Sequence, residues 1–207
     1  MNWKLINKDA RNQPTHGTYS DWKEQIASEC YNQCVYCSIH EAQFGGIDHY
    51  HIDHFKPKSK FPEHIEDIHN LFYACPICNR FKSDDWPAEP DLNATSYIDP
   101  SKINYKDLFE VSDTYEIVGK YVASKYIAIR LYLNRAQLIF ERRESFKRNQ
   151  VKELQNSIND LLSQISQIDT DLALIILETT KVYGNLLALE QLKREIRPYK
   201  TIDIRKS

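Results

Sequence analysis

The stretch that decides the fold runs from Cys34 to Lys82 and contains two Cys-x-x-Cys pairs. It opens with Cys34-Val-Tyr-Cys37 and continues through His51-Ile-Asp-His54-Phe-Lys-Pro-Lys-Ser59. It ends with His69-Asn-Leu-Phe-Tyr-Ala-Cys75-Pro-Ile-Cys78-Asn-Arg-Phe-Lys82. Paired Cys-x-x-Cys motifs are typical of a metal site with four sulfur ligands. Polar side chains that bind metals or move protons lie between the two pairs and directly after them.

The four paired cysteines, Cys34, Cys37, Cys75 and Cys78, predict one tetrahedral zinc site. Each pair can place two sulfurs at about 2.3 Å from the ion, and four protein ligands leave no position open for substrate. The zinc is therefore expected to be structural. The alternatives are incidental core cysteines, or a redox pair, for which a second matching pair would have no purpose. The fifth cysteine, Cys30, is expected to be a small buried hydrophobe.

Asp53 and His54 lie between the cysteine pairs and are candidates for chemistry. The Asp53 carboxylate suits Mg²⁺ or Mn²⁺. His54, with a reference pKa near 6.5, can take a proton from water at neutral pH. Neighbouring strand residues point to opposite faces, so a bend at Pro57 is needed to bring both side chains to one cleft. The alternative is a His-Asp pair with a purely structural role.

Two asparagines extend this set. Asn79 directly follows the last paired cysteine, so the sulfur cluster would fix its position, and its side chain could give a neutral oxygen to the metal. Asn70 could hold the loop that carries His54 by binding backbone groups. The alternative for Asn79 is that it caps a helix.

The formal net charge is −2, so nucleic-acid binding would depend on a local basic cluster. The candidates for phosphate contacts are Lys56, Lys58, Lys60, Arg80 and Lys82. A solvated charged face is the alternative for each lysine. No residue of the stretch is an evident reader of base edges, so weak sequence preference is expected.

The whole chain has an ordinary globular composition, with 207 residues, 42% hydrophobic and 27% charged. It contains no apolar run long enough to cross a membrane, and its N-terminus lacks a signal-peptide core. We therefore expect a cytoplasmic protein.

Local patterns predict the elements around the cysteine pairs. A helix is expected from near Ser20, with Trp22, Ile26 and Cys30 on one face. Residues 34–60 suit a hairpin, residues 68–83 a turn that leads into a short helix, and residues 86–105 an ordered connector.

The last third of the chain has helical periodicity. Residues 121–133 predict a helix, and Asn134 with Gln137 could cap the next one. Further along, apolar residues step by three and four, at Val151, Leu154, Ile158, Leu161, Ile165, Ile168, Leu172 and Ile175. This seam fits one long helix or a hairpin, and an N-cap at Asp169 or Thr170 favours the hairpin. The seam would either pack against the rest of the chain or bind a partner.

Residues 30–86 resemble HNH (ββα-metal) endonucleases of the zinc-knuckle type, in the order and spacing of the cysteine pairs, Asp53-His54, Asn70 and Asn79. The resemblance implies that His54 is the general base and that Asp53 and Asn79 are ligands of a catalytic Mg²⁺ or Mn²⁺. It also implies that Asn70 orients the loop of the base. Many HNH nucleases have histidine on the helix where this chain has Asn79, which leaves open whether a nearby histidine completes the metal shell.

Three short motifs, His51-Ile-Asp-His-Phe-Lys-Pro-Lys-Ser59, Tyr97-Ile-Asp-Pro100 and Leu133-Asn-Arg135, are similar to the nuclease subunit of Septu-type anti-phage systems and of related retron operons. In that family the nuclease works beside an ATPase partner. The usual acidic residue of its motif is glutamate, and Asp53 replaces it here.

Together these patterns predict an α+β protein: residues 1–110 form an N-terminal helix and an HNH nuclease domain, and residues 111–207 form a helical region. The two resemblances imply the function: DNA cleavage with low sequence specificity, as the effector of an anti-phage system with an ATPase partner. RNA as the target, and a non-catalytic zinc-knuckle module that binds nucleic acid, are the alternatives. The C-terminal helices could also join copies of the chain into a homo-oligomer.

Overall fold

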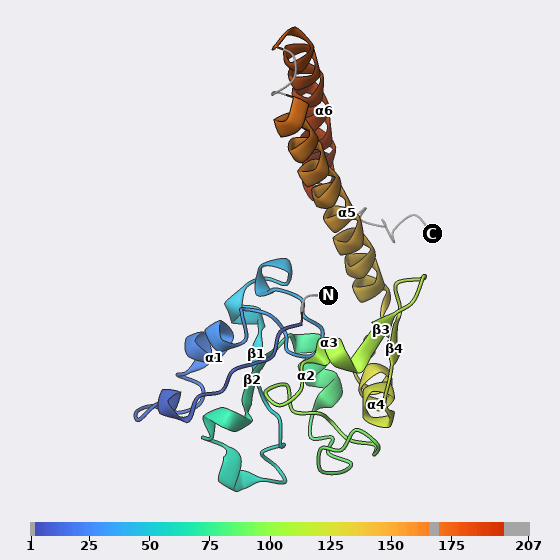
Figure 1. Cartoon of the computed structure of the whole chain (residues 1–207). Helices are drawn as coiled ribbons and strands as arrows, with labels where there is room; N and C mark the ends of the chain where they lie inside the picture. The colour runs from blue at the N-terminus through green and yellow to red at the C-terminus, as the bar shows by residue number, and fades with distance from the viewer. Residues whose placement is uncertain (1–2, 166–169, 197–207) are drawn as a thin grey trace, which may run out of the picture. The chain divides into compact units, whose positions relative to one another are not determined.

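The computed structural model describes residues 3–165 and 170–196 and divides the chain into two compact units, Met1–Ser145 and Phe146–Ser207. The first unit is α+β and contains both cysteine pairs, as the sequence predicted (Figure 1). The expected division into residues 1–110 and 111–207 stays a prediction. Among the described residues, every helix is too short or too polar to span a lipid bilayer.

The centre of the first unit is an antiparallel pair of short strands followed by a helix (Figure 1). Strand β1 (His51–His54) pairs with β2 (Leu71–Ala74), with His51 opposite Ala74 and His54 opposite Leu71. Only Cys75 separates the end of β2 from the start of helix α2 (Pro76–Lys82). Cys75 is its N-cap and Pro76 occupies its first turn, where proline costs no hydrogen bond.

The prediction of a hairpin within residues 34–60 was wrong, because the partner of β1 is β2. That strand was missed since all four of its residues are buried, so its sequence shows no alternation of apolar and polar residues. The two strands are joined by a loop with two 3₁₀ turns, η4 (Pro62–His64) and η5 (Ile68–Asn70).

Helix α1 (Lys23–Glu29) covers β2 and begins close to the predicted position. Its predicted apolar face is confirmed, because Trp22, Ile26 and Cys30 are all buried. Burial raises the pKa of the Cys30 thiol to about 11, and its sulfur accepts a hydrogen bond from Tyr73 N. Cys30 is thus a buried thiol, as expected. Three further 3₁₀ turns are η1 (Ala10–Asn12), η2 (Glu41–Gln43) and η3 (Ile47–His49).

The connector predicted over residues 86–105 contains no helix or strand before α3 (Tyr105–Leu108), and Tyr97 and Ile98 anchor it in the core. A second hairpin follows, formed by β3 (Phe109–Val111) and β4 (Ile117–Gly119). Helix α4 (Val122–Arg130) packs against β4 so closely that a Cβ atom at Gly119 would lie 2.4 Å from Lys125 N. Only glycine fits there.

The predicted helix over 121–133 ends at Arg130, and a turn then leads into α5 (Ala136–Ile165). The predicted capping role of Asn134 was wrong. Its side chain instead pairs with both backbone groups of Ile117, at 2.8 and 2.9 Å, so it joins this turn to β4.

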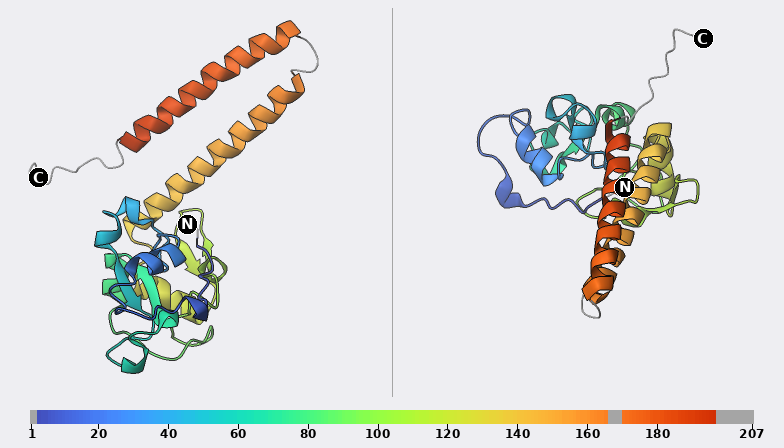
Figure 2. Two further views of the ribbon diagram at one scale, coloured as in Figure 1. Left: turned by 90° about the vertical axis from the view of Figure 1, so that its left-hand side faces the viewer. Right: turned by 90° about the horizontal axis from the view of Figure 1, so that it is seen from above.

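The second unit contains most of α5 together with α6 (Thr170–Ile196). Two helices are present where the sequence left one long helix or a hairpin open (Figure 2). The residues between them, including the proposed cap Asp169, lie outside the described residues.

Candidate metal centre and active site

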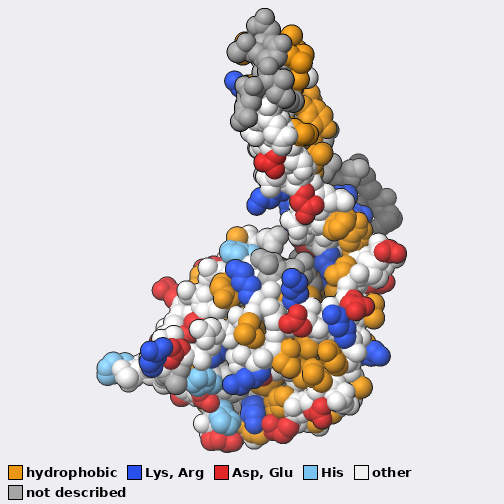
Figure 3. All heavy atoms as spheres, in the orientation of Figure 1, with side chains coloured by type: hydrophobic (Ala, Val, Ile, Leu, Met, Phe, Trp, Pro, Cys, Tyr) orange, Lys and Arg blue, Asp and Glu red, His pale blue; other side chains and the backbone are white. Residues whose placement is uncertain are grey.

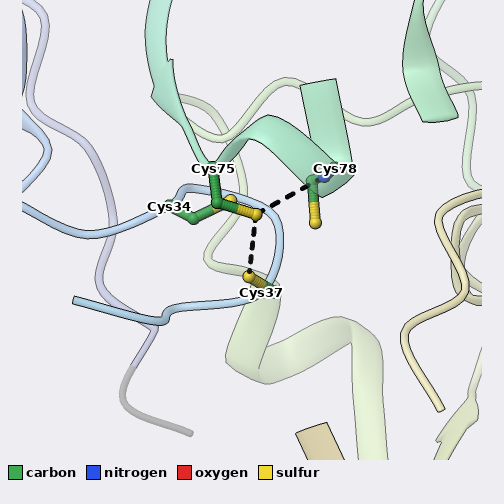
Figure 4. Close-up of side chains that lie close together, drawn as sticks. All are labelled: Cys34, Cys37, Cys75 and Cys78. Atoms are coloured by element: carbon green, nitrogen blue, oxygen red, sulfur yellow. Dashed lines mark hydrogen bonds between the residues drawn. The ribbon is translucent and has the colours of Figure 1, made fainter. Parts of the chain in front are cut away.

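The four paired cysteines converge as predicted (Figure 4). All four are buried, and their sulfur atoms lie within 4.8 Å of one another. The sulfurs of Cys37 and Cys75 are 3.7 Å apart. A tetrahedral ion with Zn–S distances of about 2.3 Å requires sulfur–sulfur distances of about 3.8 Å, so the cluster fits zinc.

The backbone brings the two pairs together. The first pair lies on a loop closed by hydrogen bonds from Cys34 N to Ile39 O and from Ser38 N to Cys34 O. Val35 N then donates to Tyr73 O at 3.0 Å, which joins this loop to β2 directly before the second pair. The sulfurs of Cys75 and Cys78 are placed by the first turn of α2, where Cys78 N donates to Cys75 Sγ.

Arg135 lies beside the cluster, and sequence reasoning missed it. Its guanidinium Nη1 and Nη2 are 3.7 and 3.8 Å from Cys78 Sγ, and Nη2 is 4.0 Å from Cys75 Sγ. Burial alone would lower the pKa of this guanidinium, but the charge of the cysteine thiolates outweighs burial and raises the pKa above its usual value. The only signal in the sequence was the short Leu133-Asn-Arg135 motif.

Asp53 is bound by one residue from the first cysteine pair's loop and by one residue from the helix that carries Cys78. Its carboxylate accepts a hydrogen bond from the hydroxyl of Tyr36, which lies inside the first pair. It also accepts one from Lys82 Nζ at 3.1 Å, on α2 after the second pair. Asp53 is 4% exposed and Lys82 is fully buried. Burial, and then the Asp53 charge, raise the pKa of Tyr36, so its hydroxyl stays protonated and donates.

The prediction that Lys82 contacts phosphate was wrong. Its ammonium group is inside the protein, between the Asp53 carboxylate and the carbonyl of His54, to which it donates at 2.7 Å. Because it binds both residues, Lys82 fixes the end of β1 against α2. A lysine that follows a cysteine pair on a short helix gives no local sign of such burial.

His54 ends β1 and is 8% exposed. Its Nε2 lies 3.1 Å from Ile65 O, and since a carbonyl only accepts, Nε2 carries the proton and Nδ1 carries the lone pair. The ring of Tyr19 meets the imidazole edge-on, with centroids 4.7 Å apart. Burial lowers the pKa of His54, although the Ile65 carbonyl opposes the shift. The imidazole is therefore neutral at pH 7, as a general base must be.

The two asparagines lie in different surroundings. Asn70 is buried, and its side chain binds both backbone groups of Lys56. Its Oδ1 accepts a hydrogen bond from Lys56 N at 2.7 Å, and its Nδ2 donates one to Lys56 O at 3.0 Å. It also donates to His64 O at 3.1 Å, so it joins the chain after His54 to the loop before β2. Asn79, on α2, is partly buried, and its side-chain amide has no hydrogen-bond partner among the described residues.

Oxygen lone pairs that a divalent cation could use remain on both Asp53 and Asn79. Two lone pairs of the Asp53 carboxylate remain beyond those used by Tyr36 and Lys82, and the Asn79 amide oxygen is available. The Lys82 ammonium offsets the Asp53 charge, which reduces its attraction for a cation. Within residues 3–165 and 170–196, the only group of three or more metal-binding side chains of Cys, His, Asp or Glu is the cysteine cluster.

The remaining predicted phosphate contacts are at the surface. Lys56 Nζ lies 3.1 Å from Glu89 Oε2 and over the rings of Phe61 and Trp86. Lys58 Nζ donates to the hydroxyl of Tyr19 at 3.3 Å, beside His54. Lys60 and Arg80 are exposed.

Two strands and a helix around a thiolate cluster, with a histidine at the end of the first strand, define a ββα-metal core. Residues 34–85 match the family model described as HNH endonuclease. This segment is therefore an HNH endonuclease domain, of a family of phosphodiester hydrolases. The predicted resemblance over residues 30–86 is confirmed for the domain. A search of curated proteins found no significant match to the chain.

The buried ion pair gives a first prediction. Asp53→Asn would leave the Lys82 ammonium buried without a counter-charge, and we expect a loss of about 3–5 kcal/mol in the free energy of unfolding. The double variant Asp53→Asn/Lys82→Met should lose less than the single variant. Urea denaturation in zinc-containing buffer measures both.

Glu110→Gln is the control, because the Glu110–Lys120 pair is exposed and 4.0 Å long, and its removal should change stability by at most about 0.5 kcal/mol. If Asp53→Asn costs no more than Glu110→Gln, the proposed role of the buried pair is wrong.

The buried imidazole gives a second prediction. In an NMR titration, His54 should have a pKa below about 6.5, because burial favours its neutral form. Tyr19→Ala would remove the ring that covers the His54 imidazole and expose that imidazole to water. The pKa of His54 should therefore rise toward 6.5 in that variant. A pKa at or above 6.5 in the natural chain, or no change in the variant, would contradict this account of the site.

Proposed function

We propose that this chain is a metal-dependent endonuclease that cleaves DNA phosphodiester bonds with low sequence specificity. The observation that supports the proposal most strongly is the state of His54 at the end of β1 in an HNH domain. Its imidazole is neutral, and the lone pair is on Nδ1. A purely structural module for nucleic-acid binding would have no need of a buried imidazole with a lowered pKa.

In the proposed reaction, His54 Nδ1 takes the proton from a water molecule as that water attacks phosphorus in line with the leaving 3′-oxygen. The P–O3′ bond breaks, and the products are 5′-phosphate and 3′-hydroxyl ends. Asn70 keeps the chain after β1 in position through its bonds to Lys56, and Ile65 O fixes the tautomer of the base.

A bound Mg²⁺ or Mn²⁺ would stabilise the charge that develops on the phosphate and on the leaving oxygen. Asp53 and Asn79 are the residues that would hold it. Two oxygen ligands are few, but Mg²⁺ in such sites keeps several waters and is also bound by substrate phosphate. Weak binding of the ion by the protein alone is therefore expected.

Lys56, Lys58, Lys60 and Arg80 are the proposed phosphate contacts. Lys58 is the best placed, because its ammonium group binds the hydroxyl of Tyr19, whose ring touches His54. Phosphate contacts position a nucleic acid without reading its sequence. We infer low specificity from the absence, among the described residues near His54, of an evident group that reads base edges.

We further propose that the chain is the effector of an anti-phage system and works with an ATPase partner. The support is the resemblance of the three short motifs, together with apolar side chains on the second unit (Figure 3). The exposed large apolar residues there are Phe146, Leu154, Leu161, Leu172, Leu174, Ile175, Leu177, Val182, Tyr183, Leu186 and Leu189. Those from Leu172 onward lie on several sides of α6, which is typical of a helix that another helix covers.

Sedimentation velocity, of the chain alone and mixed with the candidate partner, tests whether these helices bind a partner or a second copy of the chain. If a neighbouring gene encodes an ATPase, a chain that is monomeric alone and forms a stable complex with that ATPase would support the partner proposal. A stable dimer of the chain alone would favour a homo-oligomer.

The nuclease proposal predicts that purified protein nicks plasmid DNA in Mg²⁺ or Mn²⁺, and that His54→Ala lowers the rate about 10²–10⁴-fold. The control is His16→Ala, which removes an exposed histidine outside the HNH domain and should retain activity. Labelled single-stranded DNA and RNA, tested in parallel with duplex DNA, identify the substrate.

Cleavage of RNA alone would replace DNA as the substrate. Cleavage at one defined site in a random-sequence library would contradict low specificity. DNA binding without cleavage, unchanged by His54→Ala and repeated with the ATPase present, would favour the non-catalytic module.

A further inference from the structure

The turn between α4 and α5 lies against the sulfur cluster, although it is outside the HNH domain at residues 34–85. Arg135, the last residue before α5, reaches Cys78 Sγ with both terminal nitrogens, at 3.7 and 3.8 Å, and Cys75 Sγ with one, at 4.0 Å. These distances are those of N–H···S contacts. Two of the four predicted zinc ligands therefore share one guanidinium.

Arg135 is costly to hold in this place without an anion. Its Nε is buried and has no hydrogen-bond partner in the described part of the chain. Among the ion pairs of the described residues, none joins Arg135 to a carboxylate. The remaining anion in reach is the cysteine cluster. Four thiolates outweigh the charge of one Zn²⁺, so the metal-bound cluster is negative, whereas four neutral thiols would offer no charge to a guanidinium.

The same turn is tied to the rest of the first unit. Arg135 Nη1 also donates to Leu131 O at 3.3 Å, which closes the turn on itself. The side chain of Asn134 pairs with Ile117 of β4. Arg142, two turns into α5, donates to Leu133 O and to Asn134 Oδ1, both at 3.0 Å. The sulfur cluster, the turn and the start of α5 are thus joined by a continuous set of contacts.

We propose that Arg135 is an outer-shell partner of the zinc centre, which donates N–H groups to the sulfurs of Cys75 and Cys78 and through them holds the turn that begins α5. Two effects follow. The guanidinium stabilises the thiolates against loss of the metal, as residues that bind metal ligands commonly do. In return, the metal-bound thiolates supply the counter-charge that keeps Arg135, and with it residues 131–142, in place.

Arg135→Met in the full-length, zinc-loaded chain tests the first effect, because methionine keeps part of the length and loses the charge. The rate of zinc transfer to a chromogenic chelator should rise about 10–100-fold, in line with the loss of affinity typical of such partners. Arg135→Lys should give a smaller increase, because an ammonium group keeps the charge without the paired N–H groups. Arg143→Met is the matched control, in α5, since Arg143 is 46% exposed, pairs with Glu144 and should leave the rate unchanged.

Amide hydrogen exchange of the same zinc-loaded proteins tests the second effect. In Arg135→Met, exchange should rise over residues 131–142 and stay unchanged over β1, β2 and α2. If Arg135→Met does not fold, Arg135→Lys carries both measurements and should show the same pattern at smaller amplitude. Zinc transfer at the rate of the natural chain would overturn the proposal. An equal rise of exchange across β1, β2 and α2 would also overturn it, because Arg135 would then be a general support of the fold.

Discussion

The convergence of four sulfurs on one point is the constraint on which the rest of this structure depends. Two four-residue strands and a seven-residue helix are too short to be stable by themselves in water. A structural zinc site contributes roughly 10–16 kcal/mol of apparent binding free energy, and in a small domain this is folding free energy. Because one cysteine pair precedes β1 and the other joins β2 to α2, a single ion would hold all parts of the HNH domain in register.

The residues proposed for catalysis are positioned by this cluster. Tyr36, within the first cysteine pair, and Lys82, after the second, both bind Asp53, and Lys82 also binds the carbonyl of His54. The Asp53 carboxylate therefore has a structural role in addition to the ligand role that we propose, and the direction of the His54 backbone follows from it. A charge buried in this way is stable only when its partners are fixed, which the metal cluster provides.

The sequence was sufficient for the parts that have a local signature. The spacing of the cysteine pairs predicted the cluster, and the order of Asp53-His54, Asn70 and Asn79 around it predicted the HNH domain. Contacts between distant segments have no such signature. The edge-on contact of Tyr19 with His54, the burial of Lys82 and the approach of Arg135 to the sulfurs all join residues far apart in the chain. Strand β2 was missed for a different reason, since a fully buried strand lacks the period of two on which its recognition depends.

Zinc stoichiometry tests the central claim most directly. Native mass spectrometry of the intact chain, purified without added metal, should find one zinc ion per chain. Cys75→Ser should lose the ion together with the cooperative unfolding of the first unit, whereas Cys30→Ser, at the unpaired cysteine, should keep it. A natural chain that is folded and cleaves nucleic acid without zinc, or a Cys75→Ser variant that retains the ion and the fold, would contradict the account.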